Sequence, residues 1–131
     1  VDLDGRRIVP LPADHTVPAV AFQVDSGKGS LVFSGDTGPC PPLWEAVNRI
    51  GNLRYLIIEC AFSDRERALA VMSKHLCPSM LMDELTHLQR DAEVFITHLK
   101  PGQIELTMQE IEDCVGEFRP RMLQNNQLFE F

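Results

Sequence analysis

The fold is decided by the run Tyr55-Leu56-Ile57-Ile58, which lies within the longer segment from Leu53 to Cys60. So apolar a run does not suit a strand with one face in water, and it is typical of a strand covered on both faces. We therefore expect residues 53–60 to form a central strand of a covered sheet. Glu59 stands at the end of this strand, where an ionised carboxylate needs a specific partner.

Further segments on either side of this strand have an extended pattern. A polar turn with two glycines, Asp25-Ser26-Gly27-Lys28-Gly29, is expected to join two of them as a hairpin. The expected additional strands cover residues 6–11, 19–24, 30–34, 93–97 and, as a last edge strand, 128–131.

Helical segments alternate with these strands. Two helices are expected to begin with a capping box, in which a hydroxyl and a carboxylate three residues later satisfy two free amides. The boxes are Ser63 with Glu66 and Thr107 with Glu110. Two others begin at prolines, which lose no needed N–H in a first turn. The expected helices cover residues 41–50, 63–74, 78–89 and 107–118. This alternation predicts an α/β architecture, with a mixed sheet covered by helices.

The composition sets limits on size and partners. A chain of 131 residues with 44% hydrophobic residues suits one domain. A net charge of −7 argues against a nucleic-acid groove, because phosphate backbones require clustered Lys and Arg, and favours a small-molecule substrate beside bound cations. No apolar run could cross a membrane and no signal segment opens the chain, so we expect no membrane contact and favour the cytoplasm.

The four cysteines are Cys40, Cys60, Cys77 and Cys114. They are widely spaced, and no C-x-x-C pair occurs among them. A dense framework of the kind that stabilises small secreted domains is therefore not expected, and we interpret all four as reduced thiols.

Three polar residues each follow an extended segment: His15, Asp36 and His98. The carboxyl ends of strands gather along one edge of an α/β sheet, so these side chains could meet there. Two imidazoles and a carboxylate suit zinc, manganese or iron. The alternative is that the histidines are ordinary loop residues and that Asp36 only initiates a turn. Spacing alone does not decide between them.

Several strings of the sequence resemble motifs of the metallo-β-lactamase superfamily. Its third, fourth and fifth metal motifs are similar to Asp14-His15-Thr16-Val17-Pro18-Ala19-Val20, Phe33-Ser34-Gly35-Asp36-Thr37-Gly38-Pro39 and Ile96-Thr97-His98-Leu99-Lys100-Pro101. Ile58-Glu59-Cys60-Ala61-Phe62 and Ser73-Lys74-His75-Leu76-Cys77-Pro78 add to the match. The resemblance is strongest to class II cyclic-nucleotide phosphodiesterases and more distant to ribonuclease Z.

The resemblance implies half of an αββα sandwich with a two-metal centre. His15 would bind one divalent ion and His98 the other, with Asp36 bridging them; zinc is favoured, and manganese and iron are alternatives. The ions would polarise phosphoryl oxygens and turn a bridging water into hydroxide, most simply to hydrolyse a 3',5'-cyclic nucleotide. The alternatives are a ribonuclease Z-like nuclease, another hydrolase of the superfamily, and an inactive binding scaffold.

The resemblance also implies a catalytic pair, Glu59 and His75. In the similar ribonucleases the corresponding carboxylate orients the corresponding imidazole, which can then donate a proton to a leaving oxygen. We expect His75 to lie on the substrate side, apart from the metal ligands. The alternative is that Glu59 bonds loop amides and His75 caps a helix.

Two features depart from the superfamily pattern. The H-x-H-x-D-H motif, which would supply most of the remaining ligands, is absent. We therefore expect residues 1–131 to be the C-terminal half of one domain, inactive alone and partnered by an N-terminal half; a degenerate domain is the alternative. Cys77 stands where relatives tend to have Thr, and a thiol caps a helix less well than a hydroxyl. The oligomeric state stays open, with a homodimer among the options.

Overall fold

The computed structural model describes residues 1–131 as one seven-stranded sheet, in which neighbouring strands follow chain order. The first four strands pair antiparallel and the last four pair parallel, so the sheet is mixed. The strands are β1 (Asp2–Leu3), β2 (Arg6–Pro12), β3 (Val20–Asp25), β4 (Ser30–Phe33), β5 (Leu53–Glu59), β6 (Glu93–Thr97) and β7 (Arg121–Met122). The predicted α/β class and the central position of residues 53–60 are confirmed.

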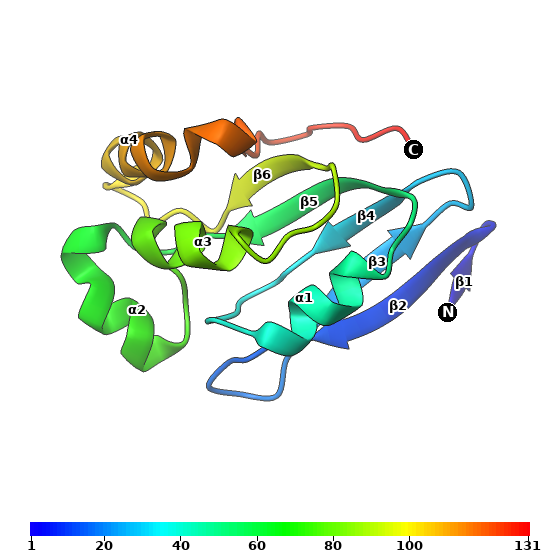
Figure 1. The fold of residues 1–131 in the computed structure, drawn as a ribbon, viewed down its shortest axis with the longest axis horizontal. Coiled ribbons are helices and arrows are strands. Elements are labelled where there is room, and N and C mark those ends of the chain that lie inside the picture. Colours follow the sequence, from blue (N-terminus) through cyan, green and yellow to red (C-terminus); the bar gives the residue numbers. More distant parts are fainter.

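The helices are α1 (Pro41–Asn48), α2 (Arg67–Ser73), α3 (Pro78–Leu85) and α4 (Ile104–Val115), with 3-10 turns η1 (Asp64–Glu66) and η2 (Gly116–Phe118). Helices α1, α3 and α4 pack against one face of this sheet, and α2 lies beyond the ends of its strands (Figure 1). Apolar side chains of the first, third and fourth helices meet Leu56 and Ile58 of β5, both essentially buried. None of these helices has the length and apolar composition that crossing a membrane requires.

The opposite face of the sheet is also apolar but only partly covered. Over β5 and β6, Ile57 and Phe95 are buried beneath the C-terminal segment. Over β3 and β4, Phe22 and Phe33 lie opposite each other in the ladder and each is 40% exposed. Strand β5 is therefore covered on both faces, as expected, whereas β3 and β4 are covered on one face and partly exposed on the other.

The predicted edge strand at residues 128–131 is wrong. The place beside β6 belongs to Arg121–Met122, and the last residues pair with no strand. Phe129 instead packs its ring against Tyr55 and Phe95, with both centroid distances at 5.0 Å. Burying an aromatic ring on an open apolar face explains this course, since each ring covers a large area.

Neither predicted capping box forms. Ser63 makes no side-chain cap hydrogen bond, and a 3-10 turn precedes α2. The last helix begins at Ile104, before Thr107, because Gly102 adopts a left-handed φ of +87° that ends the preceding turn and lets the helix start at once. Thr107 therefore lies inside α4, where its N–H donates to the Gln103 carbonyl.

The third helix is shorter than predicted, ending at Leu85 instead of Gln89. The Asn48 amide draws the following residues away from the helix axis: it donates to the His87 carbonyl and accepts from the Gln89 N–H, both at 2.8 Å. At the start of α3, the Cys77 side chain makes no capping hydrogen bond. The Asp64 carboxylate caps this helix instead, accepting the Ser79 N–H at 2.9 Å.

All four cysteines are free, as expected. Cys40, Cys60 and Cys77 are buried, and Cys114 is partly buried. Burial raises the pKa of the Cys60 and Cys77 thiols, which keeps them neutral at physiological pH. These two side chains therefore act as small apolar groups of the core.

Candidate metal centre

Four polar side chains meet beyond the carboxyl ends of the parallel strands. His15 follows β2, Asp36 follows β4, His98 follows β6, and His75 lies between α2 and α3. Imidazole centroids are 4.9 Å apart for His15 and His75, and 5.2 Å apart for His75 and His98. The topology thus gathers residues from distant parts of the chain at one edge of the sheet.

Asp36 occupies the middle of this group. Its Oδ2 lies 3.9 Å from His15 Nε2, and its Oδ1 lies 3.7 Å from His98 Nδ1. Gly35, with a left-handed φ of +59°, turns the chain outward after β4 and leaves the Asp36 carboxylate 44% exposed. Each oxygen of one carboxylate therefore faces a different imidazole.

The ring of His15 is held by the backbone of the segment that follows α2. Its Nδ1 lies 3.0 Å from the Lys74 carbonyl oxygen, which can only accept, so Nδ1 carries a proton and Nε2 is the nitrogen that faces Asp36. The Lys74 side chain also bonds Asp14 at 2.9 Å. An imidazole oriented through its second nitrogen in this way is typical of histidines that bind metals.

The loop carrying His15 is joined to the loop carrying Asp36. The Asp14 N–H donates to Thr37 Oγ1 at 3.0 Å, and the Gly38 N–H donates to the Asp14 carbonyl at 2.8 Å. A Cβ on Gly38 would lie 3.3 Å from the Lys74 Cα, so the three segments meet closely at this glycine. Their side chains are therefore placed by backbone contacts as well as by packing.

His98 is the most exposed member of the group, with half of its side chain accessible. Its φ of +61° lies in the left-handed region, which histidine adopts more readily than most residues. The ring stacks on His75, with the two planes 14° apart. This stacking fixes an otherwise solvent-facing imidazole beside Asp36.

Glu59 is the one ionisable group of the site with no exposed surface. Oε1 accepts from the Thr37 N–H at 2.9 Å and His75 Nδ1 at 2.6 Å, and Oε2 from the Leu76 N–H at 3.0 Å and the Ala61 N–H at 3.2 Å. Burial raises the pKa of the Glu59 carboxyl, and these hydrogen bonds oppose that rise. Three of the four neighbours are backbone N–H groups that can only donate, so the ionised carboxylate fits them.

The bond to Glu59 also determines what His75 can do. Its Nδ1 is engaged, so Nε2 is the ring nitrogen left to face the group of His15, Asp36 and His98. The ring is only 13% exposed and lies edge-on to Phe62, with the centroids 5.7 Å apart. A partly buried imidazole, oriented by a carboxylate, is thus presented to the centre of the site.

The structure brings all five predicted residues, His15, Asp36, Glu59, His75 and His98, to one place. Their roles as ligands and as a catalytic pair stay predictions. His75 is not spatially separate from His15 and Asp36, since one potential ligand atom from each of the three residues lies within 4.8 Å of the others; its expected role on the substrate side stays a prediction. The reason for this closeness is the Glu59 contact, which draws the ring over the end of β5.

Sequence reasoning missed the part that Lys74 plays. Its carbonyl reaches a histidine 59 positions away, and its left-handed φ of +56° occurs at a residue type that gives no sign of it. The Lys100 ammonium is held by the Glu66 carboxylate at 2.9 Å. His87, interpreted as a surface residue, is exposed.

The residues fit divalent metal ions. Two atoms that bind one zinc ion at about 2.0–2.2 Å can be at most about 4.4 Å apart. The separations of 3.9 Å and 3.7 Å between Asp36 and its two histidines lie within that limit. The donor set of imidazole nitrogens and a carboxylate suits zinc, manganese and iron, and does not select one of them.

The sequence and the fold of the chain were compared with those of known proteins. No model of a known protein family matches the sequence. A ribonuclease Z of Mycobacterium marinum is 39% identical over 59 residues, which are 44% of this chain and 21% of that enzyme.

Solved structures match more of the chain. The metallo-β-lactamase fold protein YhfI of Bacillus subtilis has a TM-score of 0.75 at 17% identity, over 95% of this chain and 49% of its own. Yeast PDE1 has a TM-score of 0.75 at 16% identity, over 95% and 45%. CmlA, a diiron β-hydroxylase of Streptomyces venezuelae, has a TM-score of 0.65 at 11% identity, over 95% and 31%.

The chain thus spans less than half the length of the structures it matches and about a fifth of the ribonuclease. Identities this low relate folds and not activities. The likeness in fold covers 95% of this chain in both structures. Residues 1–131 therefore have a metallo-β-lactamase-type fold and span about half the length of the solved structures that share it.

Proposed function

We propose that this chain is the C-terminal half of a metal-dependent phosphodiesterase. His15 would bind one of two divalent ions, His98 would bind the other, and Asp36 would bridge them. The observation that carries the proposal is that the two oxygens of Asp36 face different imidazoles, at 3.9 Å and 3.7 Å.

When bound, two divalent ions would polarise the phosphoryl oxygens and make a water molecule nucleophilic at neutral pH. The chain's own residues supply the rest of the chemistry. His75 presents Nε2 toward the site and would give its proton to the leaving oxygen. Glu59, at 2.6 Å from Nδ1, holds the ring in that orientation and balances the charge of the protonated imidazole.

The proposed substrate is a 3',5'-cyclic nucleotide. The motifs that carry His15, Asp36 and His98 are most similar to those of class II cyclic-nucleotide phosphodiesterases. The charge of the chain agrees with a small substrate: its net charge is −7, and the two lysines near the site, Lys74 and Lys100, are each paired with a carboxylate. A long polyanion would find few free cations here.

A ribonuclease Z-like nuclease is the second candidate, because the Mycobacterium marinum enzyme matches 59 residues at 39% identity. The salt dependence of the hydrolytic activity distinguishes the two candidates. Hydrolysis of a precursor RNA should weaken steeply as salt rises, since several phosphate contacts are broken together, whereas a cyclic nucleotide has one phosphate.

The proposal requires a partner half that supplies further ligands from an H-x-H-x-D-H motif. The half-exposed Phe22 and Phe33 on the open face of the sheet offer an apolar surface against which it could pack. Residues 1–131 alone should accordingly bind metal weakly and hydrolyse nothing. Tight binding of two ions by the isolated chain, measured by dialysis and elemental analysis, would contradict this expectation.

The test of the proposed function is Asp36→Asn in the complete protein. A bridging carboxylate serves both ions, so the variant should lose both and not one of them. Asp83→Asn, an exposed aspartate on α3, is the matched control and should keep two equivalents. Two full equivalents retained by Asp36→Asn in elemental analysis would exclude a bridging role.

A further inference from the structure

A small pocket lies directly beside His98, between the carboxyl ends of β6 and β7. Its volume is about 240 Å³. It is lined by Ile96, Thr97, His98, Leu99, Ile104, Met122, Leu123, Gln124 and Asn125. Because His98 is one of its walls, a ligand in this pocket would continue directly from the metal centre.

The outer wall of the pocket is a turn with a defined conformation. The Leu123 N–H donates to the Ile96 carbonyl at 2.9 Å, which extends the pairing of β7 with β6 up to the site. The Gln127 N–H donates to the Gln124 carbonyl at 3.2 Å, and the Gln124 N–H donates to Gln127 Oε1 at 3.0 Å. These bonds hold the turn in a fixed position relative to His98.

The chemistry of the lining is mixed. Leu99, Ile104 and Met122 provide apolar surface, and Gln124 and Asn125 provide amides. The Gln124 amide nitrogen donates to the Met122 carbonyl at 3.3 Å, which leaves its oxygen as an acceptor. The Asn125 amide makes no hydrogen bond within the chain, so it offers both a donor and an acceptor.

We propose that this pocket receives the nucleobase of the substrate, whose phosphate lies at the metal centre. The proposal rests on the function proposed above. The volume is below that of pockets for whole drug-sized ligands, which start at about 300 Å³, and it suits one flat ring system. Bases carry donors and acceptors along one edge and apolar faces, which matches amides beside apolar side chains. The lining has no Lys or Arg, so it is not a second phosphate site.

The experiment measures base selectivity in the complete enzyme. The variants are Asn125→Ala and Gln124→Ala, with Gln109→Ala, an exposed amide on α4, as the matched control. Each is assayed with a 3',5'-cyclic nucleotide and with bis(4-nitrophenyl) phosphate, which has no nucleobase. The ratio of the two kcat/KM values should fall about tenfold in Asn125→Ala, about the effect of one lost hydrogen bond, and stay constant in Gln109→Ala. A ratio that changes less than twofold in both pocket variants would overturn the proposal.

A second measurement separates this proposal from the proposed function. Metal-free complete protein is titrated with adenosine and with guanosine, which have a base and no phosphate, in a calorimeter. Binding that weakens about tenfold in Asn125→Ala supports the pocket even if the enzyme cleaves neither phosphodiester, in which case the proposed function alone fails. Hydrolysis of a cyclic nucleotide, together with nucleoside binding that is equal in Asn125→Ala and Gln109→Ala, overturns the pocket alone.

Discussion

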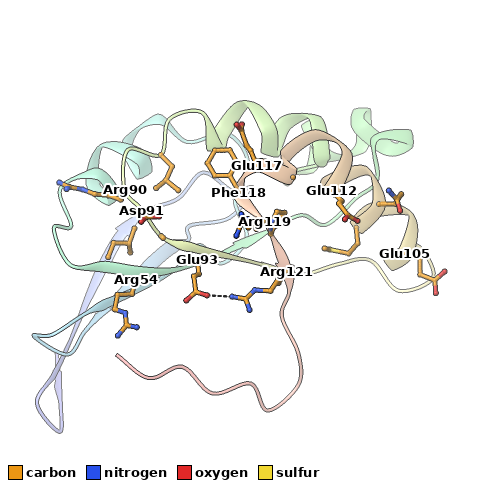
Figure 2. A pocket seen from close by; sticks show the side chains of 17 residues that line it. Arg54, Arg90, Asp91, Glu93, Glu105, Glu112, Glu117, Phe118, Arg119 and Arg121 are labelled. Atoms are coloured by element: carbon orange, nitrogen blue, oxygen red, sulfur yellow. Dashed lines mark hydrogen bonds and ion pairs between the residues drawn. The ribbon is translucent and has the colours of Figure 1, made fainter.

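The charged groups at the two ends of the parallel strands are stabilised in opposite ways, by burial with hydrogen bonds at one end and by water at the other. At the carboxyl ends, Glu59 is fully buried and accepts four hydrogen bonds from three separate segments. At the amino ends, a hollow of about 1380 Å³ is lined by charged side chains of both signs, where Arg121 and Glu93 pair although each is more than half exposed (Figure 2).

The difference shows that a large hollow lined by charged groups does not by itself indicate chemistry. Water solvates the charges of the larger hollow, so their arrangement costs little and requires no precise partners. The buried carboxylate at the carboxyl ends is costly, and each of its oxygens must therefore meet hydrogen-bond donors. Substitutions at the two ends should therefore differ widely in effect.

The largest effect is expected for His75→Ala in the complete enzyme. Loss of a general acid typically reduces turnover by about a hundredfold to ten-thousandfold. The variant should keep its metal ions, because His15, Asp36 and His98 remain in place. Parallel measurement of kcat and metal content checks both statements. Loss of one ion from a folded protein would make His75 a ligand, which its position within 4.8 Å of His15 and Asp36 allows.

A smaller effect is expected for Glu59→Gln. The amide places an NH2 group against backbone N–H groups that need an acceptor, such as those of Leu76 and Ala61. A buried donor left unsatisfied costs about 1–3 kcal/mol, which urea unfolding would measure. Turnover should fall less than in His75→Ala, because the imidazole is misoriented but present.

The double variant Glu59→Gln with His75→Ala tests whether the two residues act together. Its turnover should be little lower than that of His75→Ala alone, since the carboxylate has no imidazole left to orient. Glu66→Gln, which alters the partly buried pair with Lys100, serves as the control for a general effect of removing a carboxylate. Losses that add fully would show that Glu59 and His75 act independently.

The sequence predicts the site better than it predicts the ends of the helices. The positions of His15, Asp36 and His98 after strands allowed them to meet at one edge, and the resemblance of their motifs to the metallo-β-lactamase superfamily decided in favour of a site. The helix starts predicted at Ser63 and Thr107 are wrong. A capping box is a local sequence pattern, whereas the start of each helix depends on the course of the chain before it. The Lys74 carbonyl could not be predicted, since no local pattern reports a contact 59 positions away.

The smallest effects are expected at the amino ends of the strands. There, variants of Glu93 and Arg121 distinguish the contribution of an exposed ion pair from that of a contact between a guanidinium and an aromatic ring. Glu93→Ala removes only an exposed ion pair and should change the free energy of unfolding by less than about 0.5 kcal/mol, an effect that vanishes at high salt. Arg121→Ala also removes the guanidinium from its place over the Phe95 ring, 4.7 Å from the centroid. That contact adds about 0.5–1 kcal/mol and resists salt better than the pair does. Arg121→Ala should therefore cost more than Glu93→Ala at every salt concentration. A cost above about 2 kcal/mol for Glu93→Ala would mean that the charges of this hollow are not solvated, and the contrast between the two ends of the strands would fail.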